Sequence, residues 1–225
     1  MGESKQQILK TTETGTILLN EKDNLTYLIT KRLLDIILSI VGIVLLLPLC
    51  IIIAIIIKIE DSKGAILFKQ IRIGQNGKKF YMYKFRSMVS NAENMLEDLL
   101  DKNEASGPLF KIKEDPRITR IGKFIRKTSI DELPQLLNVL KGDMSLVGPR
   151  PALEREVKQY NSNHIQRLKV KPGLTCYWQV KGRSNLGFEE QVELDLQYIN
   201  NRNLLLDIKL IFQTLFVLFG SKNAF

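Results

Sequence analysis

Two adjacent carboxylates, Asp131 and Glu132, stand near the middle of the chain among basic residues. Arg126 and Lys127 come just before them, and Arg150 follows within a Gly-Pro-Arg-Pro sequence. Carboxylate oxygens bind magnesium, a carboxylate can act as a nucleophile, and arginines bind phosphate oxygens. An adjacent Asp-Glu pair alone is more often a helix cap than a catalytic site. The cations around this pair favour magnesium-assisted phosphoryl transfer.

An amphipathic helix is expected to position the two carboxylates. Four apolar residues recur at i, i+3, i+4 and i+7, which predicts one buried stripe: Leu133, Leu136, Leu137 and Leu140. Gly142 suits the end of such a helix. The helix starts either at Ser129, as an S-x-x-E capping box, or at Asp131 or Glu132, which places Pro134 in the first turn. Either start puts the carboxylates at the helix N-terminus, where free N–H groups bind phosphate.

Residues 65–89 have the pattern of a β-hairpin, because two short apolar runs flank Asn76-Gly77. Between Lys69 and Arg86 there are six basic residues and no acidic one. Lys84 and Arg86 alternate onto one strand face, so both can point into one site. Aromatic residues between the basic ones would also fit a nucleic-acid surface. The apolar segment upstream favours lipid headgroups and a nucleotide substrate instead.

Residues 33–57 form an apolar run that is long enough to span a bilayer. Pro48 removes a helix hydrogen bond in its second half and predicts a kink. Basic residues flank both ends, which draws both ends toward the cytoplasm. A re-entrant helix satisfies both features, and from the residues alone it competes evenly with a spanning helix. Asp35 lies three residues after Arg32, which predicts an ion pair at the membrane interface.

The composition limits the class of protein. The chain has 225 residues, enough for one core, and its net charge of +9 suits an anionic partner. Two cysteines provide no disulfide framework, which favours a reducing compartment. The single histidine, His164, lies in a polar stretch and is expected at the surface, which argues against histidine or zinc chemistry. No cleavable signal pattern precedes the apolar run.

The remaining patterns predict mainly helices. We expect helices over residues 91–102, 117–127, 153–167 and 188–200, a loop over 104–116, and a strand over 174–180. The basic stripe of 117–127 suits an anionic membrane surface. The apolar stretch 204–219 is short for a bilayer span and is expected to lie at the interface.

Several short motifs follow one another between residues 31 and 219. They are Lys84-Phe85-Arg86, Ser129-Ile130-Asp131-Glu132-Leu133, Asn138-Val139-Leu140-Lys141-Gly142-Asp143-Met144-Ser145, Gly148-Pro149-Arg150-Pro151, Lys171-Pro172-Gly173-Leu174-Thr175 and Gln179-Val180-Lys181-Gly182-Arg183. Together and in this order they resemble the bacterial sugar transferase family. These are monotopic phosphoglycosyl transferases that start capsule, exopolysaccharide and glycan assembly.

The resemblance implies a two-step reaction. Asp131 would attack the sugar-bearing phosphate of a UDP-sugar, release UMP and carry the phosphosugar, which undecaprenyl phosphate then accepts. Asp131 would also bind Mg²⁺, and Glu132 would assist on the metal side or in handling a proton. The resemblance assigns phosphate or substrate binding to a further set of residues: Lys84, Arg86, Arg126, Arg150, Arg183 and Asp195. Local likeness around residues 175–179 favours a hexose, glucose or galactose, with an N-acetylated sugar as the alternative.

The resemblance also favours the re-entrant membrane helix, with Pro48, Arg32 and Asp35 at the inner leaflet of the bacterial plasma membrane. We therefore expect a flexible tail over residues 1–30, a membrane helix over 31–60, and a small cytosolic catalytic domain over 61–225. The fold class is α/β, mostly helical, with amphipathic interfacial helices. No nucleic-acid partner is expected, and a homo-oligomer stays open. A membrane-tethered nucleic-acid-binding protein and an inactive scaffold are the alternatives from other classes.

Overall fold

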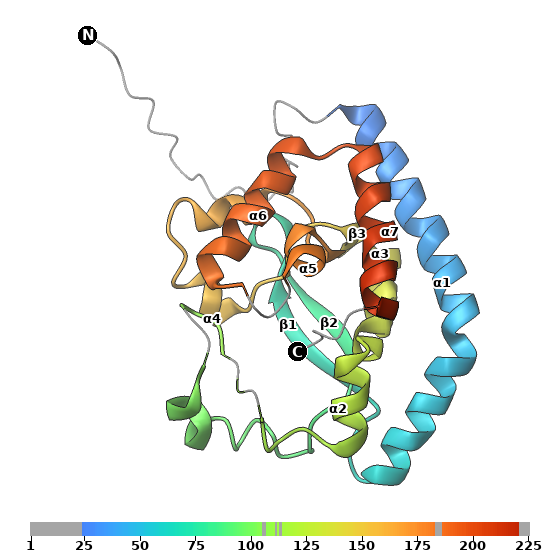
Figure 1. The fold of residues 1–225 in the computed structure, drawn as a ribbon, viewed down its shortest axis with the longest axis vertical. Helices are drawn as coiled ribbons and strands as arrows, with labels where there is room; N and C mark the ends of the chain where they lie inside the picture. Colours follow the sequence, from blue (N-terminus) through green and yellow to red (C-terminus); the bar gives the residue numbers. More distant parts are fainter. Residues whose placement is uncertain (1–23, 105–106, 111, 113, 183–185, 221–225) are drawn as a thin grey trace.

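The longest element, α1 (Leu25–Glu60), runs along one side of the molecule as a single curved helix (Figure 1). The computed structural model describes residues 24–104, 107–110, 112, 114–182 and 186–220. The side chain of Asn24 caps α1 by accepting the Thr26 N–H at 3.0 Å. The helix therefore begins at Leu25, earlier than the predicted boundary at residue 31. The rest of the predicted tail, residues 1–23, lies outside the described residues.

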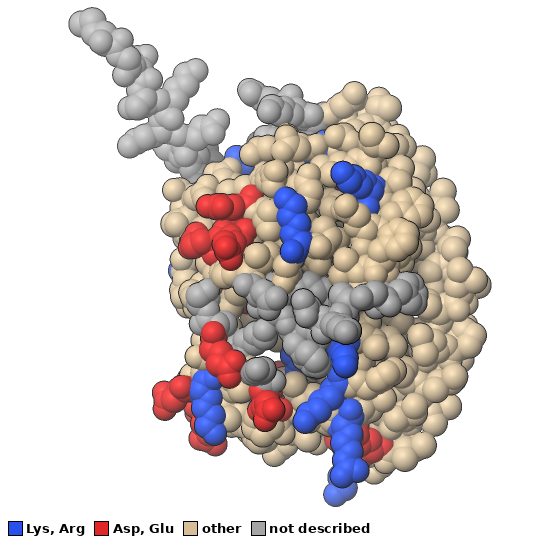
Figure 2. Space-filling model, viewed as in Figure 1, with Lys and Arg blue, Asp and Glu red and all other residues tan. Residues whose placement is uncertain are grey.

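Most of α1 faces outward. Its length and apolar composition would allow it to cross a membrane. In the space-filling view the edge that α1 forms is almost free of charged side chains, whereas charges gather over the rest of that face (Figure 2). The helix continues through Pro48 without a break. The mostly helical, membrane-associated architecture is thus consistent with the structure, and the re-entrant form of α1 stays a prediction.

The inner face of α1 carries two polar residues, Arg32 and Asp35, which were predicted to form an ion pair with each other. Asp35 is 4% exposed, and its carboxylate accepts the Ser145 hydroxyl at 3.1 Å and the Leu146 N–H at 3.0 Å. Arg32 donates to the carbonyls of Val139 and Leu140 at 2.6 and 2.7 Å. The predicted Arg32–Asp35 ion pair is therefore wrong, because unpaired backbone groups of the domain offer each side chain a nearer partner.

The predicted hairpin is confirmed. Strands β1 (Leu67–Ile73) and β2 (Lys79–Phe85) pair antiparallel across the short turn η1 (Gln75–Gly77). Asn76 and Gly77 both have positive φ angles, 57° and 78°, which is the conformation that an Asn-Gly turn favours. The base of the hairpin packs with α1 through a core of Ile53, Ile57, Phe85 and Ile125.

A second, parallel two-stranded sheet joins β3 (Ser145–Val147) to β4 (Gly173–Thr175). The two backbones approach closely after β3, where a Cβ on Gly173 would lie 2.1 Å from the Gly148 nitrogen. The predicted strand over 174–180 is wrong beyond Thr175. The partner strand β3 ends at Val147, and the next residue in register is Pro149, which has no N–H to donate to a sheet. Residues Tyr177–Lys181 form the short helix α5 instead.

Helices complete the domain. They are η2 (Glu97–Lys102), α2 (Arg120–Lys127), η3 (Ile130–Gln135), α3 (Leu136–Lys141), α4 (Glu154–Val157), η4 (His164–Lys169), α6 (Phe188–Asn201) and α7 (Leu204–Gly220). The predicted extents of the last two are confirmed. The sheet β3–β4 packs with them around a core of Val147, Val170, Cys176, Tyr198, Ile199 and Leu210.

Two predicted helices are mostly turns. Of the apolar residues in 91–102, only Ala92 and Leu99 are buried. Little apolar surface is therefore available to pack a full helix against the domain. In residues 153–167 the regular helix α4 covers only Glu154–Val157. Farther along, the Asn161 side chain accepts the N–H groups of Asn163 and His164, both at 2.9 Å, and forms a turn. That turn directs His164 inward, where it is 6% exposed, so its predicted surface position is also wrong.

Candidate active site

Asp131 and Glu132 lie on η3, beside the end of β2. The Lys84 ammonium is 2.6 Å from a Glu132 oxygen and 4.0 Å from an Asp131 oxygen. The Asp131 side chain is 10% exposed, and that of Glu132 is 39% exposed. One lysine thus faces two neighbouring carboxylates, of which one is nearly sealed from solvent and the other opens toward it.

The turn before η3 sets the direction of these side chains. Ser129 has a φ of 55°, a left-handed conformation that few residues other than glycine adopt, and its side chain makes no capping hydrogen bond. The predicted capping box is therefore wrong. Pro134 lies inside the 3₁₀ helix, and the regular helix α3 begins only at Leu136. Its end at Gly142, with a φ of 87°, is as predicted.

The predicted apolar stripe of this helix is only partly correct. Leu136 and Val139 are buried, whereas Leu137 is 41% exposed. Leu136 and Leu137 both lie in α3, which turns Leu136 and Val139 toward the domain and Leu137 toward solvent.

Asn138 connects the carboxylates to the hairpin. It is fully buried, and its amide accepts the Tyr83 N–H at 3.0 Å and donates to the Tyr81 carbonyl at 2.7 Å. These two bonds fasten α3 to the backbone of β2 on either side of Met82. Lys84 follows directly on the same strand. The Asn138 side chain therefore fixes the distance between Lys84 and the carboxylates.

Burial raises the pKa of Asp131 to about 6, although the charge of Lys84 opposes this. Burial also acts to raise the pKa of Glu132, but the charge of Lys84 and its hydrogen bond, followed by the charges of Arg150 and Arg72, hold that pKa below its usual range. The two carboxylates are therefore not equivalent. Glu132 stays ionised beside the cations, and Asp131 becomes a poorly solvated carboxylate above about pH 6.

A small cavity opens beside this pair. It is lined by Arg72, Met82, Lys84, Glu132, Gln135, Arg150, Pro151, Gly173, Leu174, Trp178 and Gln179. Three buried polar atoms of these residues have no hydrogen-bond partner in the described structure: Arg72 Nε, Trp178 Nε1 and Gln179 Oε1. Buried polar atoms nearly always have a hydrogen-bond partner. Three such atoms without a partner around one cavity therefore indicate a site where a polar ligand supplies the missing hydrogen bonds.

The structure brings some of the predicted residues together. Lys84, Glu132 and Arg150 line the cavity, and Arg150 also pairs with Glu156 at 3.1 Å. Asp131 stands next to Lys84. Arg126 is exposed at the end of α2, and its charge acts on Asp131 by lowering the pKa of that carboxyl.

The other predicted residues lie elsewhere. Arg86 follows the end of β2 at Phe85, donates to the Asp61 carbonyl at 3.0 Å, and is not among the residues that line the cavity. Asp195 is fully buried and bonds Arg167 at 2.6 and 2.9 Å, so it is part of the core rather than of the cavity. Arg183 lies outside the described residues.

The sequence of the chain matches a known protein family. Residues 26–221 match the family described as Bacterial sugar transferase. The chain belongs to this family.

Individual relatives carry more specific names. The chain is 52% identical over 202 residues to a galactosyl transferase, CpsE, of Streptococcus agalactiae, covering 88% of this chain and 44% of that protein. It is 43% identical over 203 residues to an undecaprenyl-phosphate galactose phosphotransferase of Salmonella typhimurium, covering 87% of this chain and 41% of that protein. An exopolysaccharide production protein, ExoY, of Sinorhizobium fredii is 38% identical over 191 residues, covering 83% of this chain and 84% of that protein. The chain thus spans less than half of the first two relatives and most of the third.

The sequence patterns missed several residues of the cavity: Arg72, Gln135, Trp178 and Gln179. A signal for Arg72 was present. The hairpin register places Arg72 opposite Phe80 and Phe68 opposite Lys84, so residues at even positions of the two strands share a face. Gln135, Trp178 and Gln179 come from two other elements, and only the folded chain brings them there.

The carboxylates fit the magnesium that was predicted for this family. Magnesium is commonly bound by one or two carboxylates together with the phosphates of a substrate. Among the described residues there is no cluster of three or more His, Cys, Asp or Glu side chains. The pair of Asp131 and Glu132 therefore suits an ion shared with a substrate, not an ion enclosed by protein ligands alone.

Proposed function

We propose that this protein is a phosphoglycosyl transferase that moves a sugar 1-phosphate from a UDP-sugar to undecaprenyl phosphate and releases UMP. The donor sugar would be a hexose, galactose or glucose. The Salmonella typhimurium relative is named for galactose, and a relative from Klebsiella pneumoniae, 39% identical over 208 residues, is named a UDP-glucose:undecaprenyl-phosphate glucose-1-phosphate transferase. The N-acetylated donor is the alternative. The reaction would be the first membrane step of exopolysaccharide or capsule assembly at the inner face of the plasma membrane.

One observation carries the proposal. A buried carboxylate and an ionised one stand beside a cavity that presents three cations and three unsatisfied polar atoms. Lys84, Arg72 and Arg150 would receive the two phosphates of the donor. The Trp178 N–H, the Gln179 carbonyl and the Arg72 N–H would bond its polar groups. Such a constellation serves a charged and strongly polar ligand that must meet a carboxylate.

The chemistry proposed for Asp131 proceeds in two displacements. An Asp131 oxygen attacks the phosphorus that bears the sugar, and the bond from that phosphorus to the bridging oxygen breaks, so UMP leaves with that oxygen. A phosphate oxygen of undecaprenyl phosphate then attacks the same phosphorus. The bond to Asp131 breaks, the carboxylate is restored, and the lipid carries a diphosphate sugar.

The surrounding residues would lower the charge barrier for these steps. Lys84 and Arg150 would hold phosphate oxygens that gain negative charge, and Glu132 would keep Lys84 in place through their 2.6 Å contact. A magnesium ion held by Asp131, with Glu132 beside it, would neutralise further charge on the phosphates. The apolar helix α1 would keep the acceptor lipid and the site at one membrane surface.

The reaction class is tested by UMP release. The detergent-purified full chain is supplied with undecaprenyl phosphate, magnesium and a panel of UDP-sugars. Release with UDP-galactose or UDP-glucose, and formation of a lipid-linked sugar, supports the proposal. Release confined to an N-acetylated donor would replace the hexose by the alternative sugar. No release with any UDP-sugar would contradict the proposed reaction and favour an inactive scaffold.

Replacing Trp178 with phenylalanine keeps an aromatic ring and removes the unsatisfied N–H. We expect the KM for the UDP-sugar to rise about 10-fold with little change in Tm, because one hydrogen bond to the donor is lost. Initial rates of UMP release measure this effect. Tyr81→Phe, which removes an exposed hydroxyl from a residue that lines neither cavity, is the matched control and should leave the KM unchanged. An unchanged KM in Trp178→Phe would remove this N–H from the donor site.

Replacing Lys84 with methionine removes the nearest positive charge from Asp131. Since Lys84 lowers the pKa of Asp131, its loss should move that pKa above about 6. The acidic limb of the kcat/KM profile, which requires ionised Asp131, should shift to higher pH, and the plateau should fall by roughly 10- to 100-fold. Lys79→Met, an exposed lysine of the same strand, is the control. An acidic limb in Lys84→Met that coincides with that of the unaltered protein would contradict the assignment.

A further inference from the structure

A second cavity lies between α5 and α7, on the side of α5 that faces away from the candidate active site. Its volume is about 450 Å³, and its described lining residues are Tyr177, Val180, Lys181, Lys209, Gln213, Phe216 and Val217. None of them lines the cavity beside Glu132. The two cavities therefore share a helix but no wall residue, and a ligand of one does not occupy the other.

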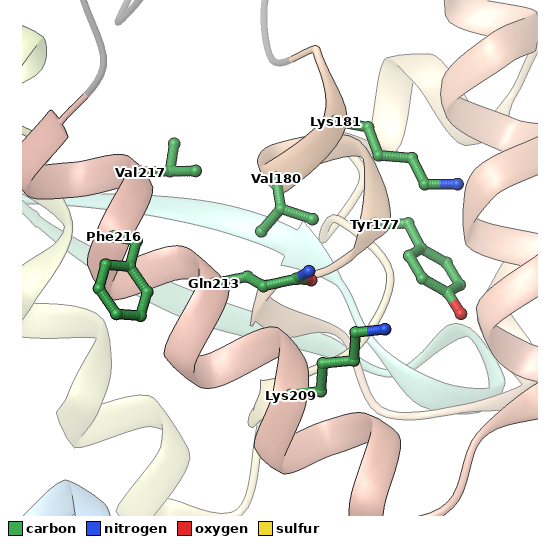
Figure 3. A pocket seen from close by; sticks show the side chains of 7 residues that line it. All are labelled: Tyr177, Val180, Lys181, Lys209, Gln213, Phe216 and Val217. Carbon is green, nitrogen blue, oxygen red and sulfur yellow. The ribbon is translucent and has the colours of Figure 1, made fainter.

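This cavity has a cationic end and an apolar end. Lys181, Lys209 and Tyr177 direct their polar atoms toward one side, whereas Phe216 and Val217 lie on the opposite side (Figure 3). Lys209, Gln213 and Phe216 recur on one face of α7 at helical spacing, so this face changes from charged to apolar along the helix. A ligand that matches both ends carries a negative head and a hydrocarbon tail.

The two lysines are available for such a head. The Lys181 ammonium lies 4.8 Å from the centre of the Tyr177 ring, and neither Lys181 nor Lys209 forms an ion pair with a described residue. The described lining of the cavity contains no carboxylate. Two cations that face one hollow without a counter-charge attract an anion, and lysine serves phosphate well as a point charge.

The apolar end continues onto the outer surface of α7. Phe216 is 76% exposed, and Phe212 and Leu215 are 58% and 46% exposed. The helix is held against α1 by Asp207, which accepts hydrogen bonds from Tyr27 and Lys31 at 2.9 and 2.8 Å. The cavity is thus one helix away from the apolar helix that would meet the membrane.

We infer that the cavity between α5 and α7 binds an anionic phospholipid, with the phosphate on Lys181 and Lys209 and an acyl chain over Phe216 and Val217. The charge complementarity of the lysine end selects an anionic lipid over a zwitterionic one. Because α5 also carries Trp178 and Gln179, the bound lipid would brace the wall of the candidate active site. This assignment does not depend on the proposed reaction, since it concerns a separate cavity.

The test measures lipid retention by the full chain in detergent, using native mass spectrometry. The probes are dioctanoyl phosphatidylglycerol, dioctanoyl phosphatidylcholine, farnesyl phosphate and inorganic phosphate. We expect phosphatidylglycerol to bind about 10-fold more tightly than phosphatidylcholine. The double variant Lys181→Gln/Lys209→Gln should lose this preference. The matched control, Lys78→Gln/Lys158→Gln, removes two exposed lysines elsewhere and should keep it.

A second variant tests the apolar end. Phe216→Ser changes an exposed side chain, so folding should be unaffected, and retention of both phospholipids should fall several-fold while binding of inorganic phosphate stays the same. Equal retention of the two phospholipids, or an unchanged preference in the double lysine variant, would overturn the inference. Retention of farnesyl phosphate but not phosphatidylglycerol would overturn it in favour of a polyprenyl ligand. Binding of inorganic phosphate as tight as that of the lipid would leave a simple anion site.

Discussion

Replacing Asp131 with asparagine should abolish UMP release, with kcat reduced by roughly 10⁴-fold or more, and should at the same time stabilise the folded protein. The first effect follows because the amide cannot displace UMP from the donor. The second follows because Asp131 is nearly sealed from solvent while its nearest cation remains 4.0 Å away. Asparagine keeps the shape of the side chain without a charge to desolvate.

The stabilisation should depend on pH. The folded-state pKa of Asp131 is raised to about 6, above the value of about 3.9 in an unfolded chain, so ionisation disfavours the folded state. Wild-type stability is therefore lost as the pH rises from about 4 through about 6, by about 3 kcal/mol in total. The Asn variant does not titrate there. The difference in unfolding free energy should be near zero at pH 4 and about 3 kcal/mol at pH 8.

Thermal unfolding of both proteins in one detergent, at a series of pH values, measures this difference. Glu132→Gln is the matched control, since its carboxylate is more exposed and has a lowered pKa. That variant should lose stability at neutral pH, where Asp131→Asn gains it. Equal stability of Asp131→Asn and wild type at pH 8 would show that Asp131 is not held in a charge-disfavouring site.

The second large effect concerns Arg167 and Asp195, which join η4 to α6 inside the core. Their side chains are 3% and 0% exposed, and Arg167 also donates to the Tyr160 hydroxyl at 3.1 Å. Arg167→Met would leave the Asp195 carboxylate buried without its cation. We expect a loss of about 3–5 kcal/mol of unfolding free energy, or roughly 10 °C in Tm.

The double variant Arg167→Met/Asp195→Leu separates a structural role from substrate binding. It removes both charges, so most of the stability should return. UMP release should return with it, since neither residue lines the cavity. If the double variant folds with the wild-type Tm but its KM for the UDP-sugar rises 10-fold or more, Asp195 contacts the substrate as the sequence resemblance predicted.

The features that the sequence predicted well depend on local patterns. The hairpin follows from alternation around Asn76-Gly77, and α6 and α7 follow from helical spacing over more than three turns. The family resemblance placed Lys84 and Arg150 in one site with Asp131 and Glu132. The structure brings Lys84 to 2.6 Å from Glu132 and has Arg150 in the same cavity.

The features that it missed depend on partners far along the chain. Lys84 and Arg86 have the same strand parity, yet the Asp61 carbonyl draws Arg86 away from the site. Asn138 looks like an ordinary helix residue, but its amide bonds the backbone of β2. His164 stands in a polar stretch and is nevertheless buried. Its ring packs against those of Tyr160 and Phe188, with ring centroids 5.6 and 5.0 Å apart. No local periodicity encodes these contacts.

Whether Asp131 carries the phosphosugar can be measured without the acceptor lipid. The purified protein is mixed with the UDP-sugar that supports turnover and with magnesium, and then quenched in acid. We expect release of one UMP per active protein and a mass increase of one sugar phosphate on the peptide that contains Asp131, both absent from Asp131→Asn. UMP release that requires undecaprenyl phosphate, with no adduct at any time, would contradict this expectation and indicate direct transfer between the two substrates.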